Sequence, residues 1–491
     1  MNIFETSALP GATEKPSVTH GKFVPAHEIR GAFAAAMSQM YRDEVPLYGD
    51  LLQIVDKINA DVLAANPDLE ADLRRTGELQ RIAPERHGAI RLGTAEELSM
   101  MRRMCAVMGM FPVGYYDLSV AGVPVHATAF RAVEPASLNR NPFRIFTSLL
   151  RRELIDDEAL RDEVKRLLSR RQIFSTAAIA LVERFEREGG LDLDSASAFV
   201  EAVLETFRWH SDALVDARTY AKLHDVHRLV ADVVSFKGPH INHLTPRTLD
   251  IDAAQEEMQA RDMGAKAVIE GPPRRTVPIL LRQTSFKALE EQIKFHGGQG
   301  EEQGTHTARF GEIEQRGLAL TRKGRALYDR LLEEARGRNG SLAEDYGQRL
   351  QQAFMHFPDA LDELRRQDLG YFQYRIDDAP ERHDLDGADL DVLDLLDVHD
   401  IMDVLVTRGI VKASPIVYED FLPVSAAGIF QSNLGGTELA AYFATAAQAA
   451  FEQALGTEVA DPFALYEAIE QESIASVLAA LRGQIDAHEV N

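Results

Sequence analysis

The apolar positions in the first part of the chain change from helical spacing to strand-like alternation. Residues 26–72 predict helices, because their apolar side chains recur every three or four positions. Residues 87–93 alternate in polarity and predict a strand, and Thr94-Ala-Glu-Glu97 then has the pattern of a capping box that begins a helix. Residues 111–119 and 123–133 are β-type runs separated by a turn. The predicted order is strand, helix, strand, strand.

This order returns after residues 142–235, whose spacing predicts dense helix. The later elements are a strand over 239–251, a helix from Asp252 to Met263, and strands over 267–270, 279–286 and 307–316. Two βαββ-type units separated by a helical segment indicate a degenerate internal repeat. The pattern therefore predicts an α+β fold with large helical insertions.

These boundaries divide the chain into five expected parts. They are an N-terminal arm with helices (1–80), a first βαββ-type unit (81–140), a helical insertion (141–235), a second βαββ-type unit (236–320), and a helical and mixed C-terminal region that closes the site (321–491).

Composition narrows the range of partners. The chain has 53 Lys and Arg against 77 Asp and Glu, a formal net charge of −24, so neither nucleic acid nor an anionic membrane is expected as a partner. The single cysteine, Cys105, excludes an intramolecular disulfide framework and fits a reducing compartment. We find no apolar run of about 18 residues and no signal-peptide pattern at the start of the sequence, so we expect a cytoplasmic protein.

Two histidines and one glutamate on predicted strands are candidate metal ligands. His87 opens the first strand of the first unit, His243 lies in the first strand of the second unit, and Glu312 lies on the last strand. Two neutral imidazoles and a carboxylate suit Fe(II), Mn(II) or Zn(II) and leave coordination positions open. The alternative for each residue taken alone is a strand histidine satisfied by hydrogen bonds, or an exposed glutamate.

Two further side chains leave alternatives open. His240 competes with His243, because residues three apart on a strand point to opposite faces and at most one can face the metal. Arg91 is four residues beyond His87 and shares its strand face. Its guanidinium could bind a substrate carboxylate through two parallel hydrogen bonds, or form an ordinary surface salt bridge, and the residues alone favour neither.

The sequence segments around these residues resemble motifs of known protein families. Asn242-His243-Leu244-Thr245 resembles the first-strand metal histidine of the vicinal oxygen chelate superfamily, and Phe310-Gly-Glu-Ile-Glu-Gln-Arg316 resembles the strand that carries the metal glutamate in 4-hydroxyphenylpyruvate dioxygenases. That register selects Glu312 over Glu314. Four longer segments resemble the 2-oxoadipate dioxygenase/decarboxylase family, also called hydroxyglutarate synthase, over roughly residues 20–480. They are His87-Gly-Ala-Ile-Arg91, Pro239-His-Ile-Asn-His-Leu-Thr-Pro-Arg247, Phe310-Gly-Glu-Ile-Glu-Gln-Arg-Gly317 and Pro423-Val-Ser-Ala-Ala-Gly-Ile-Phe430.

This resemblance implies a curved mixed sheet, made from two vicinal-oxygen-chelate units around a metal. It implies Fe(2+) bound by His87, His243 and Glu312, and a substrate contacted by Arg91 and by the two histidines. Val424 and Ser425 would also bind the substrate, and His87, Arg91, His243 and Glu312 would be the catalytic residues. The implied reaction converts 2-oxoadipate and O₂ to 2-hydroxyglutarate and CO₂, a step in lysine degradation.

Two alternative functions remain at this point. One is a redox-silent divalent-metal isomerase or lyase of the same superfamily, because three protein ligands do not fix the metal. The other is a non-catalytic protein that binds a 2-oxo acid. The sequence leaves open the preferred chain length of the 2-oxo acid, the stereochemistry of the product and the oligomeric state.

Overall fold

The computed structural model describes residues 22–119, 122–286, 289–297, 300–307, 309–336, 346–377, 397–422 and 437–489. The chain divides into two compact units. The first unit contains Met1–Glu270, Gln283–Gln315 and Phe421–Ala460, and the second contains Gly271–Arg282, Arg316–Asp420 and Asp461–Asn491. The candidate site residues that the structure describes belong to the first unit.

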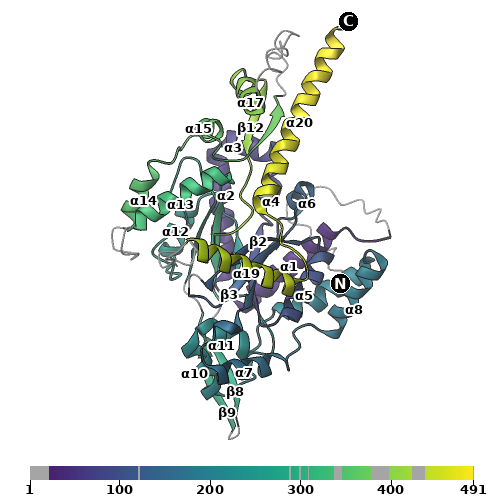
Figure 1. Cartoon of the computed structure of the whole chain (residues 1–491), viewed down its shortest axis with the longest axis vertical. Helices are drawn as coiled ribbons and strands as arrows, with labels where there is room; N and C mark the ends of the chain where they lie inside the picture. Colours follow the sequence, from purple (N-terminus) through teal and green to yellow (C-terminus); the bar gives the residue numbers. More distant parts are fainter. Residues whose placement is uncertain are drawn as a thin grey trace. The chain divides into compact units, whose positions relative to one another are not determined.

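A five-stranded mixed sheet forms the centre of the first unit (Figure 1), with the strand order β2-β3-β4-β1-β6. Its strands are β1 (Arg86–Leu92), β2 (Phe111–Asp117), β3 (Val125–Arg131), β4 (Arg144–Leu150) and β6 (Leu244–Pro246). β1 pairs in parallel with β4 and antiparallel with β6, whereas β3 is antiparallel to both β2 and β4. β6 lies in the second predicted βαββ-type unit and is the only strand of that unit, among the described residues, that belongs to this sheet.

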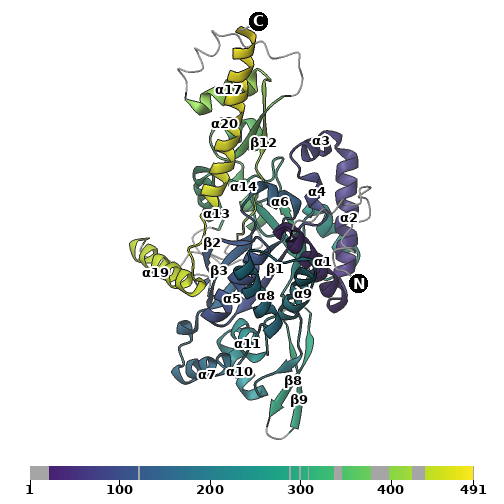
Figure 2. The ribbon, with the colours of Figure 1, turned by 90° about the vertical axis from the view of Figure 1, so that its right-hand side faces the viewer.

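Helices pack around this sheet (Figure 2), and several of them contribute to one large apolar core. The helices of the first unit are α1 (Ala26–Glu44), α2 (Tyr48–Ala65), α3 (Pro67–Arg75), α4 (Leu79–Ile82), α5 (Ala95–Val107), α6 (Pro135–Arg140), η2 (Arg152–Leu154), α7 (Glu158–Leu168), α8 (Thr176–Glu188), α9 (Leu193–Leu204), η3 (Glu205–Phe207), α10 (Ala217–Val226), α11 (Arg228–Ser235), α12 (Ile251–Ala260) and α19 (Thr437–Leu455). Cys105 is fully buried in this core, as expected for a core residue.

The start of α5 confirms the predicted cap at Thr94, while Glu97 bonds to the residue before the cap rather than to the cap itself. Thr94 Oγ1 accepts a hydrogen bond from the backbone N–H of Glu97 at 3.2 Å, and Glu97 Oε2 accepts one from the backbone N–H of Gly93 at 2.7 Å. Both bonds satisfy N–H groups that have no partner within the helix.

The prediction of dense helix over residues 142–235 is wrong for residues 144–150, which form β4. This strand is central and buried along almost its whole length, so its sequence lacks the polar alternation of a half-exposed strand. Two other predicted strands are also corrected. Residues 239–251 contribute only the three residues of β6, and residues 267–270 form no strand, although Glu270 makes an isolated bridge to Gln283.

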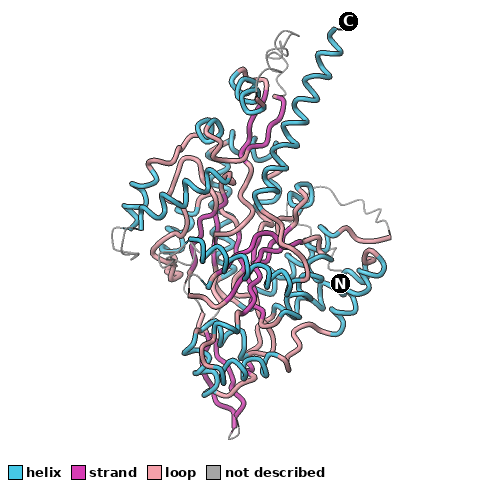
Figure 3. Tube along the Cα trace, in the orientation of Figure 1, coloured by secondary structure: helices cyan, strands magenta, loops and turns pink. Residues whose placement is uncertain are grey.

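The described residues also form three smaller sheets (Figure 3). β8 (Glu291–Gly297) and β9 (Gly300–His306) pair as an antiparallel hairpin, and β5 (Asp212–Ala213) pairs in parallel with β8. β7 (Leu281–Ser285) and β10 (Glu312–Arg316) form a two-stranded sheet. In the second unit, β11 (Phe372–Ile376) and β12 (Val411–Pro415) pair antiparallel, and the helices are α13 (Arg322–Arg336), α14 (Tyr346–Phe354), α15 (Leu361–Arg366), α17 (Val398–Thr407) and α20 (Pro462–Glu489).

No helix among the described residues combines the length and apolar character needed to cross a membrane.

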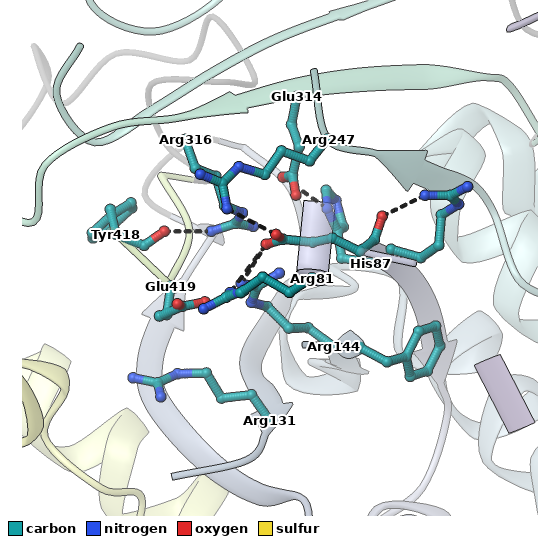
Figure 4. Close-up of polar contacts among 12 residues, drawn as sticks. Arg81, His87, Arg131, Arg144, Arg247, Glu314, Arg316, Tyr418 and Glu419 are labelled. Carbon is teal, nitrogen blue, oxygen red and sulfur yellow. Dashed lines mark hydrogen bonds and ion pairs between the residues drawn. The ribbon is translucent and has the colours of Figure 1, made fainter. Parts of the chain in front are cut away.

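A buried ion cluster fixes the end of the central sheet at which β1 begins. Glu85 is fully buried and accepts hydrogen bonds from Arg81 Nη2 at 3.3 Å, Arg144 Nη2 at 2.8 Å and Arg247 Nη1 at 2.9 Å. Two of the three arginines belong to α4 and β4, the third directly follows β6, and all three lie close to His87 in Figure 4. A buried carboxylate is tolerated only with such partners, so this cluster holds the strands in register beside His87.

Candidate metal centre and substrate cavity

Alternation along β1 places two of the candidate residues on one face. Ile90 and Leu92 are fully buried in the apolar core, although Ile90 also borders a cavity. His87, Ala89 and Arg91, which alternate with them, line the same cavity. Successive side chains of a strand point to opposite faces, so the predicted sharing of a face by His87 and Arg91 is confirmed.

The segment that carries His243 lies directly against β1. The backbone N–H of Asn242 donates a hydrogen bond to the carbonyl of Ala89 at 2.9 Å. At Gly88 a Cβ would lie 2.3 Å from Ile241 Cδ1 and 3.2 Å from the carbonyl oxygen of His243. Because glycine has no Cβ, the segment can approach closely enough to bring the two imidazoles together.

Glu312 reaches the same place through the neighbouring segment. The backbone N–H of Phe310 donates a hydrogen bond to the carbonyl of Asn242 at 3.1 Å, and that of Thr248 donates one to the carbonyl of Glu314 at 2.7 Å. The buried hydroxyl of Tyr41 on α1 donates to the carbonyls of Asn242 (3.1 Å) and Phe310 (2.7 Å). Segments almost 70 residues apart in the sequence are thereby held side by side next to the candidate ligands.

The three candidate ligands converge. Glu312 Oε1 lies 3.4 Å from Nε2 of His87 and 3.8 Å from Nε2 of His243. The two imidazole planes are inclined by 85°. The same carboxylate oxygen accepts hydrogen bonds from Thr245 Oγ1 at 3.0 Å and Gln283 Nε2 at 2.8 Å, which fix its orientation.

The electrostatics suit metal binding. Burial lowers the pKa of His243 to about 4, so this imidazole is neutral at pH 7 and offers a lone pair. Burial alone would raise the pKa of Glu312, but His243, His87 and the hydroxyl of Thr245 together hold it below its usual value. Burial would also lower the pKa of His87, but Glu314 and Glu312 raise it above its ordinary value.

This donor set fits a divalent metal ion. One ligand atom from each of His87, His243 and Glu312 lies within 4.8 Å of the others, so a single ion could contact all three. Imidazole nitrogen and carboxylate oxygen are ligands for Fe(II), Mn(II) and Zn(II), and three protein ligands leave positions open for a substrate.

A carboxylate that the sequence comparison set aside supports the first of these ligands. Glu314 is fully buried, and its Oε2 lies 2.9 Å from Nδ1 of His87 (Figure 4). The other ring nitrogen, Nε2, is the one that faces Glu312. A metal-binding histidine usually presents its second nitrogen to such a group, which fixes the tautomer and makes the imidazole a stronger ligand. Glu314 is two residues after Glu312, so strand periodicity alone could have pointed to it.

We expect Glu314→Gln to weaken metal binding about 10- to 100-fold, because the amide keeps the shape of the side chain but loses its charge. Competition of the apoprotein with a chelator for added Zn(II) measures this affinity. The control is Glu257→Gln, which changes a surface pair with Arg261 on α12. Equal affinities of wild type and Glu314→Gln would show that this carboxylate does not support the metal site.

The cavity in front of the candidate ligands has a volume of about 450 Å³. Its wall is mixed, with aromatic side chains such as Phe146, Phe310 and Phe421 near the ligands, and the cation of Arg91 on the same wall as His87. Ligand pockets typically have this size and this mixture of apolar wall and few polar groups. The cavity can hold a small organic molecule in reach of both the candidate ligands and Arg91.

Of the other residues that the sequence singled out, His240 lies in a different group, and Val424 and Ser425 cannot be placed. His240 does not join His87 and His243; it lies with Asp232 and His306 in a second buried group. Val424 and Ser425 lie outside the described residues. Sequence reasoning missed Asp232 and His306, although Asp232 stands in the apolar run Val230-Ala-Asp-Val-Val234, where a charged residue signals a buried partner.

The central sheet and the converging ligands define an α+β protein with a candidate three-ligand metal centre facing a cavity. The sequence profile of the 2-oxoadipate dioxygenase/decarboxylase family matches residues 33–433. The chain belongs to this family and is an enzyme.

Individual relatives match over nearly their whole length. The chain is 55% identical to the 2-oxoadipate dioxygenase/decarboxylase of Pseudomonas putida over 464 residues, which cover 94% of this chain and 98% of the relative. It is 54% identical to the Escherichia coli protein of the same name over 450 residues, 92% of this chain and 98% of the relative. A crystal structure of hydroxyglutarate synthase from Pseudomonas putida in complex with 2-oxoadipate is similar with a TM-score of 0.84 and 52% identity, covering 94% of this chain and 100% of that chain.

Proposed function

We propose that this enzyme converts 2-oxoadipate and O₂ to 2-hydroxyglutarate and CO₂ with Fe(II) as its metal. The observation that carries the proposal is the convergence of His87, His243 and Glu312 at a cavity that Arg91 also lines. The names of the relatives and the complex of one of them with 2-oxoadipate support the choice of substrate. The atoms balance, because the six carbons of 2-oxoadipate leave as a five-carbon product and CO₂, and both oxygen atoms of O₂ enter these products.

The proposed ligands are His87, His243 and Glu312. When bound, Fe(II) would supply the redox chemistry with O₂ that no side chain of the protein can supply, and would polarise the 2-oxo acid. The protein orients two of the three donors, through Glu314 on His87 and through Thr245 and Gln283 on Glu312.

The other residues of the cavity would bind and orient the substrate. We assign Arg91 the role of pairing with a substrate carboxylate, because a guanidinium can present two parallel N–H donors to it. The aromatic wall beside the ligands would exclude water and strengthen this ion pair. Val424 and Ser425, which follow the cavity residue Leu422 closely in the sequence, are assigned to substrate binding by their resemblance to the family motif.

The proposed architecture is a pair of vicinal-oxygen-chelate units, residues 81–140 and 236–320, around the metal. The pairing of β1 with β6, with His87 opposite Thr245, supports this arrangement because each unit then contributes one histidine from adjoining segments. The other proposed parts of the chain are the N-terminal part (1–80), the helical insertion (141–235) and the C-terminal region (321–491). A cytoplasmic role in lysine degradation follows from the same proposal.

An oxygen electrode tests the function. Protein loaded with Fe(II) under argon is mixed with 2-oxoadipate and air-saturated buffer, and O₂, CO₂ and 2-hydroxyglutarate are measured. We expect one O₂ consumed and one CO₂ released for each 2-hydroxyglutarate, and no turnover under argon. Undiminished turnover without O₂ would instead favour an isomerase or lyase, and binding of 2-oxoadipate without turnover a binding protein.

A further inference from the structure

A second buried polar group is separate from the candidate ligands and reaches the cavity through one of its members. It contains Asp232 on α11, His240, and His306 at the end of β9, all less than a tenth exposed. Asp232 also lines the cavity. The proposed function assigns no role to these three residues.

Asp232 is the ion-pair partner of Arg91. Its Oδ2 accepts a hydrogen bond from Arg91 Nη1 at 2.6 Å, while its Oδ1 lies 2.8 Å from Nε2 of His306. Burial would raise the pKa of Asp232, but His240, Arg91 and the hydrogen bond from His306 hold it well below its usual value, so the carboxylate is charged. One edge of the guanidinium is thereby fixed, and the side chain of Arg91 remains about a quarter exposed, at 25%.

A chain of hydrogen bonds continues behind the carboxylate. Nδ1 of His306 lies 2.8 Å from the hydroxyl of Tyr220 on α10. The consistent assignment is that Tyr220 donates to Nδ1 and the Nε2–H of His306 donates to Asp232. Trp209 stacks on His306 with an angle of 4° between the rings, which restrains the imidazole further. Asp232 therefore has little freedom to follow a moving arginine.

These residue types could also bind a metal ion, but the contacts favour an orienting network. Oδ2 of Asp232 already accepts a hydrogen bond from Arg91. A divalent ion bound to the same carboxylate would therefore lie beside a positive charge. Nε2 of His240 already has two polar neighbours, Asn242 Nδ2 at 3.2 Å and Asp232 Oδ1 at 3.4 Å, so it is engaged within the network.

We propose that Asp232, supported by His306 and Tyr220, is the positioning residue for Arg91, and that it aims the guanidinium at the substrate carboxylate. The inference rests on the proposed function, in which Arg91 binds that carboxylate. Asp232 acts through Arg91, so its effect on the enzyme should require the arginine to be present.

A double-mutant cycle tests this dependence. The kcat and KM for 2-oxoadipate are measured for wild type, Asp232→Asn, Arg91→Ala and the double variant, all loaded with Fe(II). We expect Asp232→Asn to lower kcat/KM about tenfold or more, mainly by raising KM, and to have almost no further effect in the Arg91→Ala background. Asp61→Asn is the control, because Asp61 forms an exposed pair with Lys57 on α2 and should leave kcat/KM unchanged.

Tyr220→Phe is a milder variant that removes only the far hydroxyl and keeps the test available if Asp232→Asn fails to fold. We expect a smaller rise in KM that also disappears in the Arg91→Ala background. Metal bound per chain, measured on the same samples after Fe(II) loading and desalting, should be equal in wild type, Asp232→Asn and Tyr220→Phe.

The outcomes separate the inference from the function on which it rests. If Asp232→Asn lowers kcat/KM equally with and without Arg91, the positioning role of Asp232 is overturned. If Arg91→Ala itself has a low kcat/KM in that experiment, the proposed role of the arginine still stands. Near-wild-type kcat/KM in Arg91→Ala would overturn both. Loss of one of two bound ions in Asp232→Asn would identify the group as a metal site and overturn the positioning role.

Discussion

His243→Ala is expected to abolish turnover of 2-oxoadipate and to lower bound Fe(II) sharply, because the variant removes one of three donors that converge within 4.8 Å. The loss of metal affinity should exceed the roughly 10- to 100-fold that is typical when only an outer partner of a ligand is removed. His87→Ala and Glu312→Ala should behave in the same way. Metal analysis after anaerobic loading and desalting, together with the oxygen-electrode assay, measures both effects.

His240→Ala is the matched control, since it removes an imidazole three residues away that lies with Asp232 and His306. We expect this variant to retain its iron. Circular dichroism and thermal unfolding establish that both variants are folded, which is expected because the large apolar core of the first unit is unchanged. Full iron occupancy in His243→Ala, with loss in His240→Ala, would exchange the roles of the two histidines.

Arg91→Ala is expected to lower kcat/KM for 2-oxoadipate by about ten- to more than a hundredfold. A charge-assisted arginine–carboxylate contact in a partly dry cavity contributes about 1.5–3 kcal/mol, and each 1.4 kcal/mol corresponds to about a factor of ten. Arg91→Lys keeps the charge but loses the planar fork, so it should recover only part of the activity. Steady-state kinetics of the three proteins measure the effect.

Iron content should stay normal in both arginine variants, because arginine is not a metal ligand. A comparison of 2-oxoadipate with 2-oxohexanoate, which lacks the terminal carboxylate, shows which carboxylate Arg91 binds: a selective loss for 2-oxoadipate identifies the terminal one. Near-wild-type kcat/KM in Arg91→Ala would show that Arg91 does not bind the substrate and only pairs with the buried Asp232.

Local sequence signals predicted the elements that depend on neighbours in the chain. The cap at Thr94 and the shared strand face of His87 and Arg91 follow from spacing alone. β4 was missed because a strand buried in the middle of a sheet lacks polar alternation, and its charged surroundings have helical spacing.

The arrangement around the candidate ligands depends on contacts between distant segments. The prediction that His240 and His243 point to opposite faces assumed a regular strand, but His243 lies just before a strand of only three residues. The structure nevertheless places the two histidines in different groups. Asp232 and His306 are 74 residues apart, and no local pattern connects them. The three-dimensional structure brings these residues together, through the pairing of β1 with β6 and the packing of α11.

An anomalous difference map measured at the iron absorption edge, from crystals of Fe(II)-loaded protein grown under argon, would locate the metal. We expect one strong peak in contact with His87, His243 and Glu312, facing the cavity that Arg91 lines. A peak among Asp232, His240 and His306 with none at the first group would contradict this expectation.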